Sequence, residues 1–216
     1  MTRPSLTAAA AVLAAADPVL DDLVRHYGPP RLGRRTHTTE RFAALARIIC
    51  YQQLAGRAAR VIHGRFVDAV GGVVTPATVA ATPTAALRAA GLSAAKAAAV
   101  ADLADKVGSG LVPLERIGRL GDEEVIDHLV QIRGIGRWSA EMFLLGTLRR
   151  LDVWPVGDYG VRAGFATAWG LPEVPAPASL HPLGEQFRPY RSVVAWYCWR
   201  VVDTPVPVEA LSAAAS

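Results

Sequence analysis

The stretch IRGIGRWSAEMF, residues 132–143, places Gly134 and Gly136 on either side of one isoleucine. Glycine adopts positive φ angles at little cost and lets the backbone approach another molecule closely. Arg137 and Trp138 follow at once, where an apolar run typical of a helix begins. The first N–H groups of a helix are unpaired and lie at the positive end of its dipole. Together with the Arg137 guanidinium, they predict a binding site for an anion such as phosphate.

Both the turn and the acidic residue that follows it have a purely structural alternative. A Gly-x-Gly sequence by itself favours a plain αα-hairpin ended by glycine, and the residues Arg137, Trp138 and Ser139 weaken that interpretation. Asp158 opens a later apolar run, so it is expected to act as an ordinary helix N-cap. The two roles are compatible, since a capping carboxylate is held in place and is usually ionised.

The elements that must position these residues are helices, because apolar residues recur at helical spacing along nearly the whole chain. Alternating runs typical of strands are scarce, so the sequence predicts an all-α fold. A proline-rich linker is expected over residues 171–183. The expected helices are 18–28, 39–55, 57–70, two short ones within 75–92, 94–107, 121–132, 137–148, 158–170 and 184–202.

Composition excludes some classes of protein and leaves others open. A hydrophobic content of 51% excludes a disordered chain, and the net charge of +4 suits a polyanionic partner without proving one. All basic residues are arginine except Lys96 and Lys106; arginine suits bidentate phosphate contacts, but a high-GC coding sequence explains this usage better. Cys50 and Cys198 cannot form a disulfide framework or a four-thiolate cluster. No stretch suits a membrane span, and we expect a cytoplasmic protein.

The segments GIGRWSAEMFLL and DVWPVGDYGVR resemble a known combination of motifs. They are similar to the helix–hairpin–helix, Gly-Pro-rich loop and aspartate of the base-excision DNA glycosylase superfamily, and most similar to its 3-methyladenine DNA glycosylase II branch. Residues 49–66, 91–107 and 187–200 match in the same order, so the resemblance spans roughly residues 17–202. It implies one all-α unit over residues 1–216 with two lobes, about 36–120 and 1–35 plus 121–216, and a cleft between them.

The resemblance implies that Asp158, 22 residues after Gly136 (158 − 136), carries the chemistry. Members of the superfamily that nick DNA have a lysine where this chain has Trp138, so water is the implied nucleophile here. The implied activity is that of a monofunctional N-glycosylase without lyase activity. Such an enzyme hydrolyses the glycosidic bond of alkylated purines of the 3-methyladenine or 7-methylguanine type. The role implied for Asp158 is to stabilise the sugar as it becomes cationic.

The implied base pocket consists of aromatic rings around a base flipped out of the helix. Trp138, Tyr159 and Trp199 match its positions, and their rings would favour a cationic base through cation–π contact. Met142 stands where the related bacterial enzyme has a further aromatic residue, which implies a roomier and less selective pocket. Core packing is the alternative role for each ring.

The implied partner is duplex DNA containing alkylated bases, bound by a monomer, so the resemblance also implies association with the nucleoid. Gly134, Gly136 and Arg137 would hold its backbone, while Gln52 and especially Gln53 match the loop that fills the gap left by the base. A polar helix end facing water explains the two glutamines equally well.

Relatives also bind an alkali ion, Na⁺ or K⁺, through hairpin carbonyls, which here are those of Ile132 and Gly134. No other cofactor is implied, and the five histidines show no metal-ligand spacing.

Two departures from the family pattern leave the substrate range open: Arg133 replaces a proline, and Gly157 replaces an acidic residue. Two other hypotheses remain at this point. One is a non-catalytic helix–hairpin–helix DNA-binding protein, and the other is an unrelated helical binder of small molecules.

Overall fold

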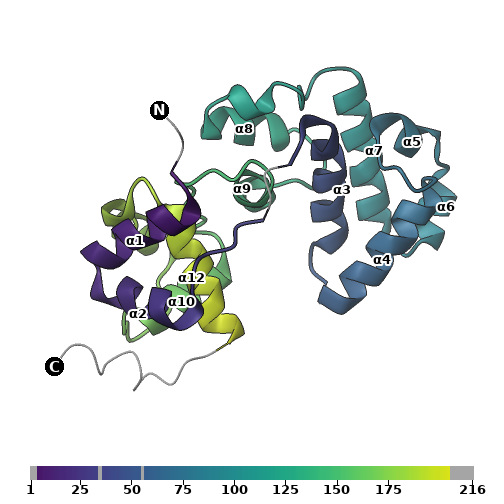
Figure 1. Ribbon diagram of the computed structural model, residues 1–216. Helices are drawn as coiled ribbons and strands as arrows, with labels where there is room; N and C mark the ends of the chain where they lie inside the picture. The colour runs from purple at the N-terminus through teal and green to yellow at the C-terminus, as the bar shows by residue number, and fades with distance from the viewer. Residues whose placement is uncertain (1–3, 34–35, 55, 205–216) are drawn as a thin grey trace. The chain divides into compact units, whose positions relative to one another are not determined.

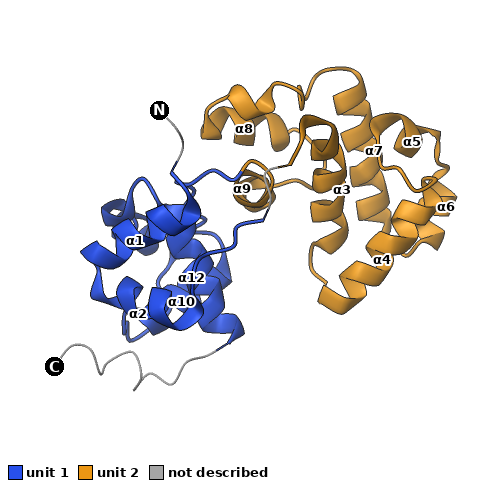
Figure 2. Ribbon diagram, in the orientation of Figure 1, with its two compact units in different colours: residues 1–33, 149–216 blue, residues 34–148 orange. Residues whose placement is uncertain are grey.

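The computed structural model describes residues 4–33, 36–54 and 56–204 of the chain. All regular elements in these ranges are helices, which confirms the all-α fold class. The chain forms two compact units (Figure 2): unit 1 comprises residues 1–33 and 149–216, and unit 2 comprises residues 34–148. Among the described residues, no helix has the length and apolar character needed to cross a membrane.

Unit 1 combines helices from the N-terminal and C-terminal parts of the chain (Figure 1). Its two N-terminal helices begin at capping side chains: Ser5 accepts a hydrogen bond from the N–H of Ala8, and Asp17 accepts one from the N–H of Leu20. Its helices are α1 (Leu6–Ala16), α2 (Pro18–Tyr27), α10 (Tyr159–Ala168), α11 (Pro177–Leu183), the 3₁₀ turn η3 (Glu185–Phe187) and α12 (Arg191–Asp203).

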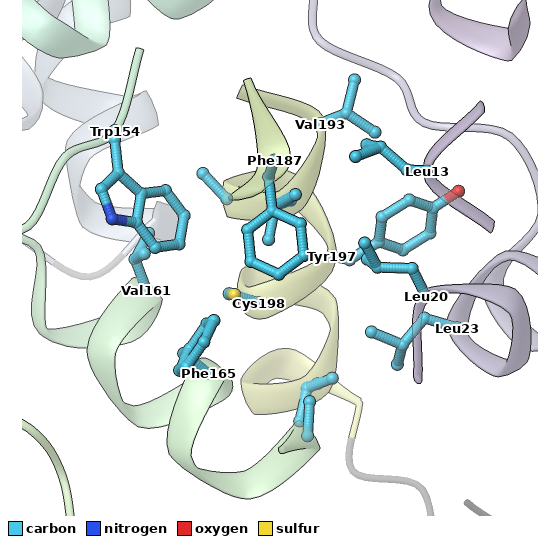
Figure 3. Packing of buried hydrophobic residues seen from close by; sticks show 14 of the residues in the cluster. Leu13, Leu20, Leu23, Trp154, Val161, Phe165, Phe187, Val193, Tyr197 and Cys198 are labelled. Carbon is cyan, nitrogen blue, oxygen red and sulfur yellow. The ribbon is translucent and has the colours of Figure 1, made fainter. Parts of the chain in front are cut away.

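The core of unit 1 forms around α12, which packs against α10, α2 and α1. Tyr197 and Cys198 are fully buried on this helix, with Phe165 of α10 and leucines of α1 and α2 around them (Figure 3). Burial raises the pKa of the Tyr197 hydroxyl to about 12. It also raises the pKa of the Cys198 thiol, so this cysteine is a core residue and not a reactive thiol.

Helices α10 and α12 approach closely because α10 carries glycine at the contact. A Cβ atom on Gly164 would lie 2.0 Å from the carbonyl oxygen of Cys198. On the next turn toward the N-terminus, a Cβ on Gly160 would lie 3.0 Å from the Trp199 ring. The spacing of the two helices is therefore set by the absence of side chains at these positions.

Unit 2 is built around α3 and α7, which lie side by side (Figure 1), and α9 packs against α3. Short helices pack on α7, and α8 packs on α9. The elements are η1 (Thr38–Glu40), α3 (Arg41–Tyr51), α4 (Gly56–Ala69), α5 (Pro76–Ala81), α6 (Thr84–Ala89), α7 (Ala94–Gly108), η2 (Ile117–Arg119), α8 (Asp122–Leu129) and α9 (Arg137–Gly146).

The structure differs from the sequence-based expectation in several places. Helix α1 (Leu6–Ala16) was not among the expected helices. Residues 121–148 belong to unit 2 by their contacts, whereas the expected lobes grouped them with the C-terminal helix. The expected linker 171–183 contains a helix, α11, which starts at Pro177 because proline suits the first helical position. The last helix starts at Arg191 and not at residue 184, since Pro189 disfavours helix at the residue before it.

We expect Gly164→Ala to lower the free energy of unfolding by about 1–3 kcal/mol, because the added methyl group must push α10 away from α12. Urea denaturation followed by circular dichroism measures this change. Gly64→Ala is the matched control, because a Cβ on Gly64, in the interior of α4, meets no atom within 4 Å. It should raise stability by about 0.5–1 kcal/mol through helix propensity. A Gly164→Ala protein as stable as wild type would contradict the close helix contact.

Candidate active site

The Gly-Ile-Gly turn connects α8 to α9 within unit 2. Ile132 and Ile135 are buried and anchor the turn, while Gly134 and Gly136 are exposed. Of these two glycines, Gly134 alone has a positive φ, 76°, so it is the one that the backbone conformation requires. Gly136 is the extended N-cap of α9, and a Cβ there would meet no atom within 4 Å. Glycine at 136 therefore leaves room beside the helix N-terminus, as a bound phosphate backbone would need.

Arg137 lies at the first position of α9 and is paired with carboxylates. Its Nη1 and Nη2 donate to Glu123 of α8 over 2.9 and 2.6 Å, and its Nε donates to Glu141 over 3.2 Å. These hydrogen bonds raise the pKa of Arg137 and lower that of Glu123. The pair with Glu123 is exposed to solvent, and such pairs contribute little net free energy, so a phosphate can compete with Glu123 for this guanidinium.

Trp138 and Met142 lie one helical turn apart on α9. The Trp138 side chain is 42% exposed, which is unusual for an indole and argues against the core-packing alternative. Met142 is half-buried. Residues four apart share a helix face, so these two side chains form one surface of unit 2.

The two glutamines after α3 have different surroundings. Gln52 Nε2 donates to the carbonyl oxygen of Gly134 over 2.9 Å and to Ser139 Oγ over 3.0 Å, so its side chain is engaged with the hairpin. Gln53 is exposed and has a left-handed backbone, with φ 54°. The geometry therefore favours Gln53 over Gln52 as the residue that can reach a partner.

Asp158 is the N-cap of α10 in unit 1. Its Oδ1 accepts hydrogen bonds from the backbone N–H of Val161 over 2.8 Å and from the indole Nε1 of Trp199 over 2.9 Å. The sequence predicted the cap, and the indole partner adds a second constraint on the carboxylate. Tyr159 is next to it and is 65% exposed, with the Arg162 guanidinium 5.5 Å from its ring centre.

The loop before Asp158 is fixed by α12 through residues that sequence reasoning did not identify. Ser192 Oγ accepts from the N–H of Val153 over 2.9 Å and donates to the carbonyl oxygen of Arg150 over 2.7 Å. Arg191 is buried, and its Nε donates to Asp152 Oδ1 over 2.8 Å. The sequence offered no local signal for these contacts, which join residues about forty positions apart.

The predicted site residues thus form two groups. Unit 1 brings together Asp158, Tyr159 and Trp199. Unit 2 brings together the Gly-Ile-Gly turn, Gln52 and the first turn of α9. A cleft shared by both groups stays a prediction.

Oxygen ligands are present at the hairpin for the predicted alkali ion. The carbonyl of Ile132 accepts from the N–H of Ile135, and that of Gly134 accepts from Gln52. A carbonyl oxygen has two lone pairs, so each can still bind a cation. In the described part of the chain, histidine, cysteine and acidic residues form no cluster suited to a metal ion.

Comparison with known proteins places this arrangement in a family. Residues 46–185 match the family described as "HhH-GPD superfamily base excision DNA repair protein", where HhH stands for helix–hairpin–helix. The chain is also 36% identical to DNA-3-methyladenine glycosylase 1 of Schizosaccharomyces pombe, over 91% of this chain and 87% of the relative. The protein therefore belongs to the HhH-GPD superfamily of base excision DNA repair proteins.

Solved structures agree with this assignment. A 3-methyladenine DNA glycosylase from Schizosaccharomyces pombe in complex with abasic DNA superposes with a TM-score of 0.83 at 34% identity, covering 91% of this chain and 97% of the other. A DNA-3-methyladenine glycosidase from Bacillus halodurans gives 0.80 at 31% identity, covering 91% and 89%.

We expect Asp158→Ala to lower the free energy of unfolding by about 1–2 kcal/mol, since it removes a helix cap and a partner of Trp199. Asp158→Asn keeps an oxygen acceptor and should cost less than about 1 kcal/mol. Asp17→Ala is the matched control, because Asp17 caps α2 and also accepts from an indole, that of Trp169, over 3.2 Å. Urea denaturation should give similar losses for both alanine variants. No loss for Asp158→Ala alone would contradict the hydrogen bonds described.

Proposed function

We propose that the protein is a monofunctional DNA glycosylase that excises alkylated purines from duplex DNA by hydrolysis. The bond between C1′ and the base nitrogen breaks, and its electron pair leaves with the base. Water then adds to C1′ and loses a proton, so the products are a free base and an abasic site. The Asp158 carboxylate stabilises the positive charge on the sugar and orients the water.

The observation that carries this proposal is the double constraint on Asp158 Oδ1 by Val161 and Trp199. A charge-stabilising group acts best when its position does not change during the reaction, because no energy is then spent on reorganisation. The carboxylate belongs to a helix cap and is also held by an indole, so both partners fix it before substrate arrives.

The surroundings of the lysines support hydrolysis over attack by an amine. Lys96 Nζ donates to the carbonyl oxygens of Cys50 and Gln52, and Lys106 Nζ donates to Asp102 and to the carbonyl of Gln131. Both amines are therefore engaged in unit 2, and Trp138 stands between Arg137 and Ser139 where a Schiff-base lysine would be needed.

The chemistry of the rings supports an alkylated base as substrate. Methylation at N3 or N7 gives a purine a positive charge and makes it a good leaving group, so little acid catalysis is required. The exposed rings of Trp138 and Tyr159, with that of Trp199, would each favour a cationic base by about 0.5–2 kcal/mol. The protein would bind the flanking phosphates as a monomer, through the Gly-Ile-Gly turn and an alkali ion on the Ile132 and Gly134 carbonyls.

Asp158→Asn should abolish release of 3-methyladenine from methylated duplex DNA while DNA binding is retained, because the neutral amide cannot stabilise a cationic sugar. Single-turnover base release, measured by chromatography, tests this together with a binding titration on the same duplex. Asp17→Asn is the matched control, since it makes the same change at the other indole-bonded cap of unit 1 and should leave the rate unchanged.

Wild-type release of base by Asp158→Asn would refute the catalytic role. The same reactions distinguish the mechanism: hydrolysis leaves abasic sites that break only on heating, whereas immediate strand breaks would refute the monofunctional assignment. If the wild-type protein binds the duplex and releases no base, a non-catalytic DNA-binding protein is the better description.

Trp199→Phe should slow base release by about 10- to 100-fold, because a hydrogen bond to a charged group contributes about 1.5–3 kcal/mol. Phenylalanine keeps an aromatic ring and removes only the N–H that donates to Asp158. Trp169→Phe removes the equivalent donor to Asp17 and should leave the rate within about twofold of wild type. Equal effects of the two substitutions would mean that the indole acts only through stability.

A further inference from the structure

Helix α7 carries a stripe of residues that contacts two exposed segments of unit 2. Lys96, Ala99, Asp102 and Lys106 recur at intervals of three or four residues, so they share one helix face. At one end of this stripe lies the loop that follows α3, and along the rest lies the Gly-Ile-Gly hairpin. None of these four residues was identified as functional from the sequence.

Lys96 fixes the loop that follows α3. Its Nζ donates to the carbonyl oxygen of Cys50 over 2.8 Å and to that of Gln52 over 2.7 Å. The last carbonyls of a helix have no partner within the helix, and a positive charge there also complements the helix dipole. Partial burial lowers the pKa of Lys96. The amine is thus a C-terminal cap for α3 supplied by another helix.

The same loop is tied to the hairpin by Gln52. Its Nε2 donates to the Gly134 carbonyl and to Ser139 Oγ, which belongs to a residue only 3% exposed. The backbone of Gln52 is thus held by Lys96 while its side chain is held by the turn and by α9. The next residue, Gln53, is exposed with a left-handed φ of 54°. Its position relative to the turn depends on these two contacts.

The hairpin is fixed to α7 separately. Asp102 Oδ2 accepts from the N–H of Arg133 over 2.7 Å, and Lys106 Nζ donates to the same oxygen over 2.8 Å. Lys106 also donates to the carbonyl of Gln131. A Cβ on Gly134 would lie 3.3 Å from the Cβ of Ala99, so the turn also packs directly on the stripe. The two lysines of the chain therefore hold two different loops against one helix.

We propose that Lys96 is a positioning residue that holds the Gln53 loop at a set distance from the Gly-Ile-Gly turn, so that the loop fills the gap in the duplex while the turn holds the phosphate backbone. This inference rests on the proposed function. It assigns the two lysines separate roles. Lys96 supports binding to DNA in which a base is missing from the stack, and Lys106 supports the contact between the hairpin and the phosphate backbone.

The test compares binding to two duplexes of the same sequence, one undamaged and one with a tetrahydrofuran abasic analogue. In Lys96→Met, affinity for the abasic duplex should fall about tenfold, while affinity for the undamaged duplex should change less than about twofold. Lys106→Met is the matched control, since it removes the same charge from the same helix face. It should weaken binding to both duplexes by a similar factor, because it loosens the hairpin.

Two further variants distinguish positioning from general loss of structure. Lys96→Arg keeps donors for the two carbonyls and should restore most of the preference for the abasic duplex. Gln52→Met removes the amide donor at nearly constant volume. Because this amide also contacts the hairpin, the variant should bind both duplexes more weakly and lose more affinity for the abasic one, which provides a test even if Lys96→Met does not fold.

Some outcomes would overturn the inference. An unchanged ratio of the two affinities in Lys96→Met would do so, whether neither affinity falls or both fall by the same factor, and if Lys96→Met does not fold, an unchanged ratio in Gln52→Met would do so. Failure of the proposed function gives a different result, because the wild-type protein would then release no base from methylated DNA, whatever the binding preferences of the variants.

Discussion

The hydrogen bonds that Asp158 accepts from the Val161 N–H and the Trp199 indole determine where the proposed catalytic carboxylate lies. The first bond ties the carboxylate to α10 and the second ties it to α12, so its position follows the packing of two helices. That packing is close because Gly164 lies against the Cys198 carbonyl. A carboxylate on a free loop would have to be ordered during the reaction, whereas this one is ordered by folding.

Both units hold loops in the same way, with polar side chains of a neighbouring helix bonded to loop backbone. In unit 1, Ser192 at the start of α12 bonds to the loop that leads to Asp158. In unit 2, Lys96 and Lys106 of α7 bond to the loop after α3 and to the hairpin. Loops carry unpaired backbone groups, so such bonds satisfy those groups and restrict loop motion at once.

Ion pairs beside the hairpin affect how Arg137 would bind a phosphate. Arg137 lies where a phosphate would bind, yet it is paired with Glu123 and Glu141. The carboxylates orient the guanidinium beside the N-terminus of α9, and in the proposed complex DNA phosphates would compete with them for it.

The sequence by itself determined the features that depend on neighbours three or four residues apart. The all-α class, the cap at Asp158 and the turn between α8 and α9 follow from apolar spacing and from residue types that favour caps and turns. The expectation missed α1, took the proline-rich segment that contains α11 for a linker, and placed the start of α12 before Pro189.

The tertiary structure alone decided which distant groups meet. Trp199 donates to Asp158 from 41 residues away, Lys96 reaches Cys50 across 46, and Gln52 reaches Gly134 across 82. Local propensity carries no information on such pairs, because they form only when helices pack and bring buried or half-buried polar groups within hydrogen-bond distance.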